Sequence, residues 1–140
     1  AVAQVDAESL SSQINAKEKE QLDRSFGVMD RGRKPRGYAP ALGELEKAQK
    51  ARATRRQRDV VDRSLIDLMS VYRDVLTIQL GTDAALVNEE LRADLTELGR
   101  RTTPEVNLRR IEVILTAREQ VMEFNVPPLL ALESMMTALR

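Results

Sequence analysis

The longest uninterrupted helical pattern in the chain limits the fold most strongly. From Ala41 nothing in the sequence stops a helix until Gly81, which predicts one helix of roughly 40 residues with Pro40 in its first turn. Its first half is charged on most sides. In its second half, side chains suited to a core recur at steps of three and four residues: Val61, Leu65, Leu68, Tyr72, Val75, Leu76 and Gln79. Such steps form one face of a helix, so the second half is expected to pack on a core.

Shorter helices are predicted on either side of this segment. A polar helical pattern covers residues 6–26 and is expected to end at Gly27, because glycine readily adopts the left-handed conformation that follows many helices. Further along, Asn88 is expected to cap a helix whose first turn holds the acidic residues 89–90, which suit the positive end of the helix dipole.

Two more helices are predicted in the last third of the chain. Thr102 or Thr103 is expected to cap a helix that runs to about Phe124. Residues 125–128 must break it, because the residue before a proline avoids helical geometry. A last helix from Pro128 presents Leu129, Leu132, Met136 and Leu139 on one face, broadened by Leu130 and Met135. No alternating strand pattern competes anywhere, so the predicted fold class is all-α, a small helical bundle preceded by a polar helix and a long basic helix.

The predicted organisation has three parts. Residues 1–29 form the polar helical segment, residues 30–39 form a linker rich in Gly, Pro and Arg, and residues 40–140 form the helical domain with a basic extension at 40–58. The chain lacks an initiator methionine and starts within a polar helical pattern, so it is expected to be a piece of a longer protein.

Composition excludes several classes of chemistry. The chain contains no cysteine and no histidine, so it has no disulfide framework and lacks the usual ligands of zinc and the usual base for nucleophilic catalysis. No apolar run reaches the roughly 20 residues that a membrane span needs. We therefore expect a cytoplasmic protein without cofactor, metal or catalytic residues and without a membrane partner. A small helical enzyme is the weakest hypothesis, and a structure without a polar pocket of about 300 Å³ would exclude it.

The net charge of zero hides a strongly basic segment. Residues 31–58 hold ten basic and two acidic residues, a balance of +8, which leaves −8 for the rest of the chain. Six of these basic residues lie within about three helical turns and are candidate contacts for nucleic acid or for an acidic partner. They are Lys47, Lys50, Arg52, Arg55, Arg56 and Arg58. A solvated helix face is the alternative, and base stacking is not expected because no aromatic residue lies among them.

Two arginines lie inside predicted apolar segments. Arg73 and Asp74 are adjacent, so they point about 100° apart and are not expected to form a simple pair on one face. Arg118 would need a carboxylate partner if buried, and Asp74 and Glu133 are the candidates. For all three residues a structural role is favoured over a functional one.

Several short motifs occur in an order that resembles the bacterial DNA polymerase III delta prime family. They are Tyr72-Arg-Asp-Val-Leu76, Val87-Asn88, Arg118 and Asn125-Val-Pro-Pro-Leu-Leu-Ala-Leu-Glu133, with Pro127 at a position where the family often has Asn. The segment 45–59 resembles an extension of actinobacterial members. The related gamma/tau subunits share a similar C-terminal architecture. The resemblance makes Tyr72, Arg73, Asp74, Asn88, Arg118, Asn125, Leu132 and Glu133 the candidate structural or interface residues of the motifs.

The resemblance implies a collar domain of a clamp loader, which opens the sliding clamp and places it on primed DNA during replication. In such loaders five subunits join through their C-terminal domains into a ring. The implied partners are the subunits gamma/tau and delta, bound through the final helix and the helix over 61–80, with DNA reached through the basic helix or through the whole complex. Surfaces meant for neighbours would also let the isolated chain self-associate. The alternative function is a helical nucleic-acid-binding module that uses residues 47–58.

Overall fold

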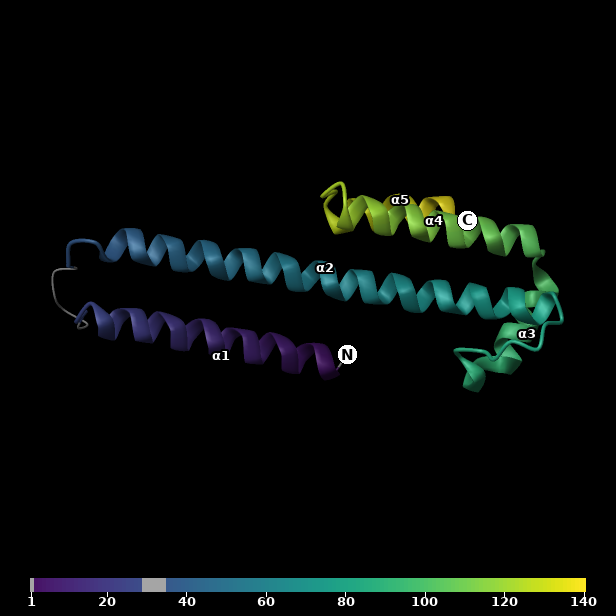
Figure 1. Cartoon of the computed structure of the whole chain (residues 1–140), viewed down its shortest axis with the longest axis horizontal. Helices are drawn as coiled ribbons and strands as arrows, with labels where there is room; N and C mark the ends of the chain where they lie inside the picture. Colours follow the sequence, from purple (N-terminus) through teal and green to yellow (C-terminus); the bar gives the residue numbers. More distant parts are fainter. Residues whose placement is uncertain (1, 29–34) are drawn as a thin grey trace. The chain divides into compact units, whose positions relative to one another are not determined.

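All regular structure in the described part of the chain is helical. The computed structural model describes residues 2–28 and 35–140, with side chains from residue 9 onward. It contains α1 (Val2–Ser25), α2 (Tyr38–Gln79), the short 3-10 helix η1 (Glu89–Leu91), α3 (Arg92–Arg101), α4 (Pro104–Met122) and α5 (Pro128–Ala138) (Figure 1). No strand occurs in these residues. The predicted all-α fold class is confirmed, and the long predicted helix corresponds to α2.

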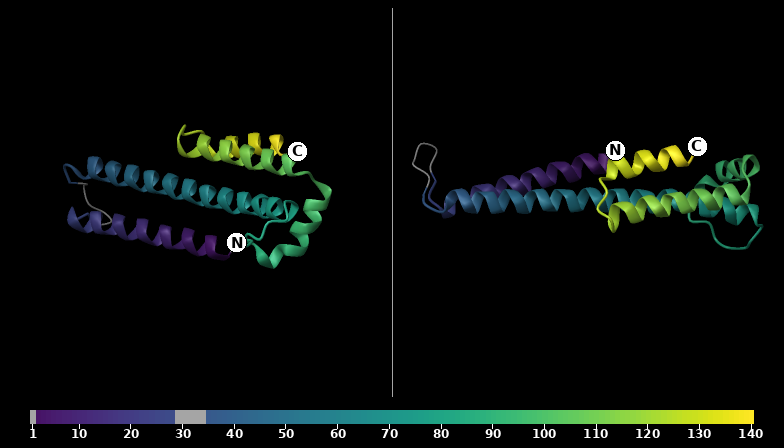
Figure 2. Two further views of the ribbon diagram at one scale, coloured as in Figure 1. Left: turned by 45° about the vertical axis from the view of Figure 1, so that its right-hand side comes forward. Right: turned by 90° about the horizontal axis from the view of Figure 1, so that it is seen from above.

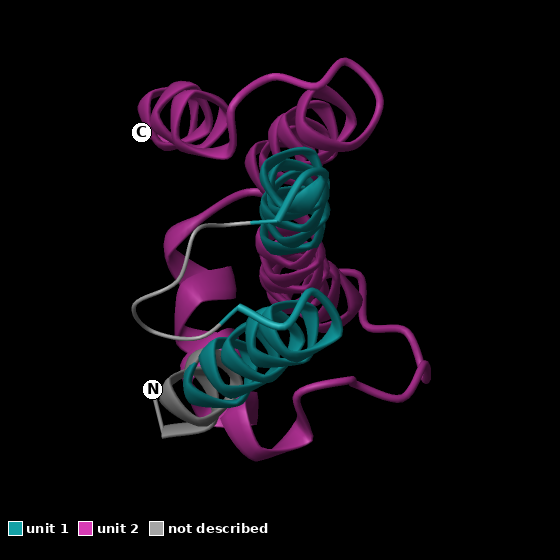
Figure 3. Cartoon of the chain, turned by 90° about the vertical axis from the view of Figure 1, so that its left-hand side faces the viewer, with its two compact units in different colours: residues 1–55 teal, residues 56–140 magenta. Residues whose placement is uncertain are grey.

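The chain divides into two compact units, Ala1–Arg55 and Arg56–Arg140, with the division inside α2 (Figure 3). The division into residues 1–29, 30–39 and 40–140 stays a prediction. Within the predicted linker, residues 30–34 lie outside the described residues, and the rest already leads into α2.

The first unit is a helical hairpin. In Figures 1 and 2, α1 runs antiparallel to the first part of α2. Tyr38 is the residue that the hairpin buries most. Its ring lies edge-to-face with that of Phe26, with 5.8 Å between the ring centroids, and its hydroxyl donates a hydrogen bond to Asp23. The stop after α1 is the predicted one, because Gly27 has φ +61° and its N–H donates to the Arg24 carbonyl.

The second unit contains the hydrophobic core of the molecule. Leu65 of α2, Ile114 and Ala117 of α4 and Met135 of α5 are buried together. Half-buried residues surround them: Val61, Leu68, Met69, Tyr72, Val113, Leu132 and Leu139. The predicted apolar face of α2 therefore does pack on a core. The apolar residues recur at three- and four-residue steps because these steps place them in one continuous stripe on the helix, which can be buried.

Of the two predicted helix caps, the one at Thr103 is confirmed and the one at Asn88 is wrong. Thr103 caps α4 by accepting a hydrogen bond from the Val106 N–H, and Pro104 follows it, as predicted. The predicted cap at Asn88 is wrong, because its side chain makes no capping bond and only the short η1 follows it. The α-helix itself begins at Arg92.

Candidate interaction site

The motif residues of α2 hold the connection to η1 in place. The side chain of Asp74 is completely buried and accepts four hydrogen bonds. Two come from the N–H groups of Val87 (3.1 Å) and Asn88 (2.7 Å), one from the Asn88 amide (2.9 Å) and one from Arg73 (3.2 Å). These bonds use the full accepting capacity of a carboxylate, about four sites. Asp74 thus fixes the backbone at residues 87–88 against α2.

These bonds also determine the ionisation of Asp74. Burial alone would raise its pKa, but the hydrogen bonds from Asn88 and Val87 and the nearby Arg73 outweigh burial and lower the pKa below the ordinary value. The carboxylate is therefore charged in the folded protein at neutral pH. A buried charge of this kind is tolerable because each oxygen has its hydrogen-bond donors.

Two sequence-based expectations are corrected here. Arg73 does contact Asp74, at 3.2 Å, although adjacent residues leave a helix in different directions. The long arginine side chain bends back and also donates to the Ala85 carbonyl at 3.4 Å. The Asn88 side chain donates to Asp74 and Ser70 instead of capping a helix. The Asn88 side chain binds Asp74 of α2 and does not cap η1, because the buried Asp74 carboxylate needs hydrogen-bond donors.

A second polar network, which no motif of the sequence predicts, joins the end of α2 to α3 and α4. Asn107 is fully buried and donates to Gln79 at 3.0 Å and to the Thr102 hydroxyl at 2.8 Å. Gln79 in turn donates to the carbonyls of Gly99 and Thr102, both at 2.8 Å. Gly99 permits this approach, since a Cβ there would lie 3.3 Å from the Gln79 Cγ. The one signal in the sequence was a polar Gln79 on an otherwise apolar face.

Arg118 links α4 to α2. Its guanidinium binds the carboxylate of Asp62 through two nitrogens, so the candidates Asp74 and Glu133 are wrong. The pair raises the pKa of Arg118, chiefly through the hydrogen bond to Asp62. Arg110 lies over the ring of Tyr72 at 5.4 Å from its centroid, and Tyr72 itself packs on the core. These contacts fasten α4 along α2.

The last motif residues form the turn and helix at the C-terminal end. Asn125 has φ +55°, a left-handed conformation that asparagine tolerates better than most residues, and the Val126 N–H closes the turn on the Gln120 carbonyl at 2.9 Å. Leu132 packs on the core, whereas Glu133 is exposed.

The outer face of α5 carries large apolar side chains that the described part of the chain leaves exposed. The helix buries Ala131 and Met135, yet Leu129, Leu130 and Met136 are 70%, 58% and 59% exposed. Phe124, just before the helix, is 67% exposed. Glu133 is the one charged residue of α5. Large apolar side chains gathered on an exposed surface often mark a protein interface, so this face is a candidate surface for a partner.

The candidate basic residues lie in α2 and differ in their surroundings. Lys47, Lys50, Arg52 and Arg55 are exposed in the first unit, while Arg56 and Arg58 are half-buried in the second. Arg52 binds Glu18 of α1 through two parallel hydrogen bonds. Hydrogen bonding from Arg52, and next from Gln49, lowers the pKa of Glu18.

The described residues offer little that resembles a catalytic centre. They contain no group of three acidic residues placed to hold a metal ion. A hollow of about 460 Å³ beside the α2–η1 connection exceeds the size needed for a small ligand, so volume alone does not exclude an enzyme. Its charged lining residues are Asp83 and Arg92, and they form no acid–base pair. No described helix has the length and apolar character required to cross a bilayer.

A family comparison connects these surfaces to a known domain. Residues 51–140 match the model of the C-terminal domain of the DNA polymerase III delta subunit. The chain belongs to this family. The match covers α3, α4 and α5 and most of α2, and with it the Asp74 anchor, the Asn107 network and the α5 face. Searches among curated proteins and among solved structures gave no match. As a DNA polymerase III delta C-terminal domain, the matched part belongs to a clamp-loader subunit and to replication.

Proposed function

We propose that this chain is the collar-forming domain of a delta prime subunit and acts by binding the neighbouring subunits gamma/tau and delta. It would lock one subunit into the ring from which the clamp loader is built, in the cytoplasm. Its role in this proposal is structural, and catalysis is left to other parts of the complex.

The exposed face of α5 is the observation that carries the proposal. An exposed row of Leu129, Leu130 and Met136 costs solubility in a lone domain but supplies the apolar centre that subunit interfaces need. Burying the exposed parts of these side chains would favour association by about 25 cal/mol for each Å² of apolar surface removed from water.

The polar residues of the second unit support a scaffold role. The side chains of Asp74 and Asn107 form their hydrogen bonds with other groups of the same chain, and Arg118 is paired with Asp62. Catalytic side chains must instead meet a substrate, so residues engaged in this way are better suited to fixing helix positions. A rigid bundle presents a docking surface with little loss of conformational entropy on binding.

The assignment to delta prime rests on the order of the motifs. Tyr72-Arg-Asp-Val-Leu76, Asn88 and the segment 125–133 follow the delta prime pattern, and segment 45–59 resembles the extension of actinobacterial members. A subunit within a ring of different chains needs two different binding surfaces. We assign one to α5 and expect the other on the part of α2 after Val61.

Co-expression with the neighbours tests this proposal. The chain would be tagged and co-purified with the C-terminal domains of gamma/tau and delta, in moderate salt and with nuclease. A complex of defined stoichiometry is expected. If the chain is folded but captures neither partner, the collar assignment is wrong.

A further inference from the structure

One face of the first unit carries basic side chains that the hairpin leaves unpaired. Lys47, Lys50 and Arg55 are exposed, and none of them forms an ion pair with another described residue. Arg52, one turn away, is the exception because it is bound to Glu18. We call Lys47, Lys50 and Arg55 the basic face.

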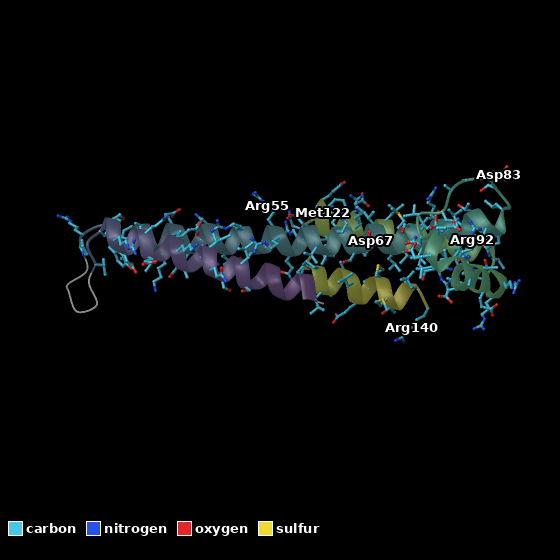
Figure 4. All side chains as sticks on the ribbon, turned by 90° about the horizontal axis from the view of Figure 1, so that it is seen from below. Arg55, Asp67, Asp83, Arg92, Met122 and Arg140 are labelled. Atoms are coloured by element: carbon cyan, nitrogen blue, oxygen red, sulfur yellow. The ribbon has the colours of Figure 1, made fainter. Side chains whose placement is uncertain are left out.

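Helix geometry explains why α1 neutralises one side of α2 and not the other. Residues turn by about 100° each, so Leu45, Gln49 and Arg52 share one side. Gln49 and Arg52 contact α1 there: Gln49 donates to Glu18 at 3.0 Å and to the Asn15 carbonyl at 3.2 Å. By the same rotation Lys47 and Lys50 point away from the α1 side, and Arg55 lies at its flank, about 90° from it. In Figure 4, Arg55 extends from α2 away from α1.

We propose that the basic face binds the phosphate backbone of duplex nucleic acid. Lys47 and Arg55 are eight residues apart, which corresponds to about 12 Å along a helix. A DNA duplex carries one charge per about 1.7 Å of its axis, so about seven phosphates lie within that length. Three cations at this spacing can reach phosphates together, and they release the counterions that drive such binding.

The hairpin limits how nucleic acid can bind. α1 packs against one side of α2 through Gln49 and Arg52, so nucleic acid can reach α2 only from the sides that α1 leaves open. No aromatic residue lies within 42–58, which leaves no platform for stacking bases. We therefore expect contacts to the phosphate backbone and no base stacking.

The basic face is less suited to a protein partner. Stable protein interfaces are centred on aromatic or large apolar side chains. The residues between the cations on this face are Ala51 and Thr54, which are small and offer no such anchor. The whole chain has a net charge of +0, so its total charge would not attract nucleic acid. Any electrostatic attraction must come from the basic face itself.

Fluorescence anisotropy with a labelled duplex of arbitrary sequence, about 20 base pairs long, tests the proposal on the intact chain. We expect micromolar binding at low salt and a logarithmic salt slope near −2.7, from about 0.9 for each of three contacts. The triple variant Lys47→Glu, Lys50→Glu, Arg55→Glu should bind at least about tenfold more weakly, with a slope near zero. A second variant with glutamine at the three positions should lie between the two, and circular dichroism checks that both stay helical.

The matched control is Arg100→Glu, Arg109→Glu, Arg140→Glu, which makes the same change in charge at exposed positions of the second unit. Its affinity should stay within about twofold of the original, because these residues make no contact with phosphates in the proposal. The proposal is overturned if the original chain does not bind at low salt, or if the control variant loses as much affinity as the triple glutamate variant of the basic face. It is also overturned if polyglutamate binds the basic face as tightly as the duplex does, which would indicate an acidic protein partner.

Discussion

The carboxylate of Asp74 combines full burial with charge, and the surrounding donors make this combination stable. Its four hydrogen bonds come from three residues, and two of the donors are backbone N–H groups of the α2–η1 connection. A single side chain thus replaces the regular hydrogen bonds that a connection of this length lacks.

Substituting Asp74→Asn should destabilise the second unit by about 2–4 kcal/mol. The four hydrogen bonds now end on two carboxylate oxygens, whereas an amide has only one oxygen that accepts them. The substitution Asp67→Asn is the matched control on the same helix, and its exposed side chain should cost less than about 0.5 kcal/mol. Urea unfolding measures both values. Equal effects of the two substitutions would show that Asp74 is not an anchor.

Acid should remove the contribution of Asp74 in a defined direction. Its pKa is lower in the folded chain than in the unfolded chain, so its stabilisation is complete above the ordinary aspartate pKa of about 4. The stabilisation is lost as the pH falls through the folded value. The difference in unfolding free energy between the original chain and Asp74→Asn should therefore shrink from pH 6 to pH 3. A difference that stays constant would contradict this account.

At the scale of helices, α4 is fastened to α2 by Arg118 and Asp62. The pair is partly exposed, so a double-mutant cycle with Asp62→Ala and Arg118→Ala should give a coupling of about 1 kcal/mol, smaller in high salt. The exposed pair of Glu89 and Arg92 serves as the comparison and should give no more than about 0.5 kcal/mol. A coupling near zero for Arg118 and Asp62 would mean that apolar packing alone holds α4.

The two faces of α5 should respond differently to the same substitution. Met135 is buried in the core, so Met135→Ala should cost about 2–5 kcal/mol of stability. Its neighbour Met136 is mostly exposed, and Met136→Ala should change stability by less than about 0.5 kcal/mol. Thermal unfolding of both variants measures the difference. A large loss for Met136→Ala would place its side chain in the core and remove it from the proposed interface.

The elements were easier to predict from the sequence than their contacts. The period of α2, the stop at Gly27 and the cap at Thr103 depend on local geometry, which neighbouring residues determine. The partner of Arg118 and the role of Asn88 depend on which helices meet in space. On α5 the apolar pattern named the surface residues but did not separate Met135 from Met136, because large apolar residues also lie on the exposed side of the helix, beside Glu133, Ser134 and Thr137.

For the whole molecule, the uncovered apolar residues predict self-association when no partner is present. Large apolar side chains are exposed on α4 and α5 and around the turn between them, including Leu115, Met122 and Phe124. Sedimentation velocity should show a mass that increases with concentration, and Leu129→Ser with Met136→Ser should reduce this increase. A strictly monomeric chain at every concentration would contradict the prediction.

Sedimentation velocity of a reconstituted mixture shows whether α5 binds neighbouring clamp-loader subunits. The chain would be mixed with the C-terminal domains of gamma/tau and delta, beside the folded variant Leu129→Ser, Met136→Ser. We expect one complex that contains the original chain, and the loss of at least one neighbour with the variant. If the original chain sediments alone, or if the variant assembles equally well, α5 is not the interface.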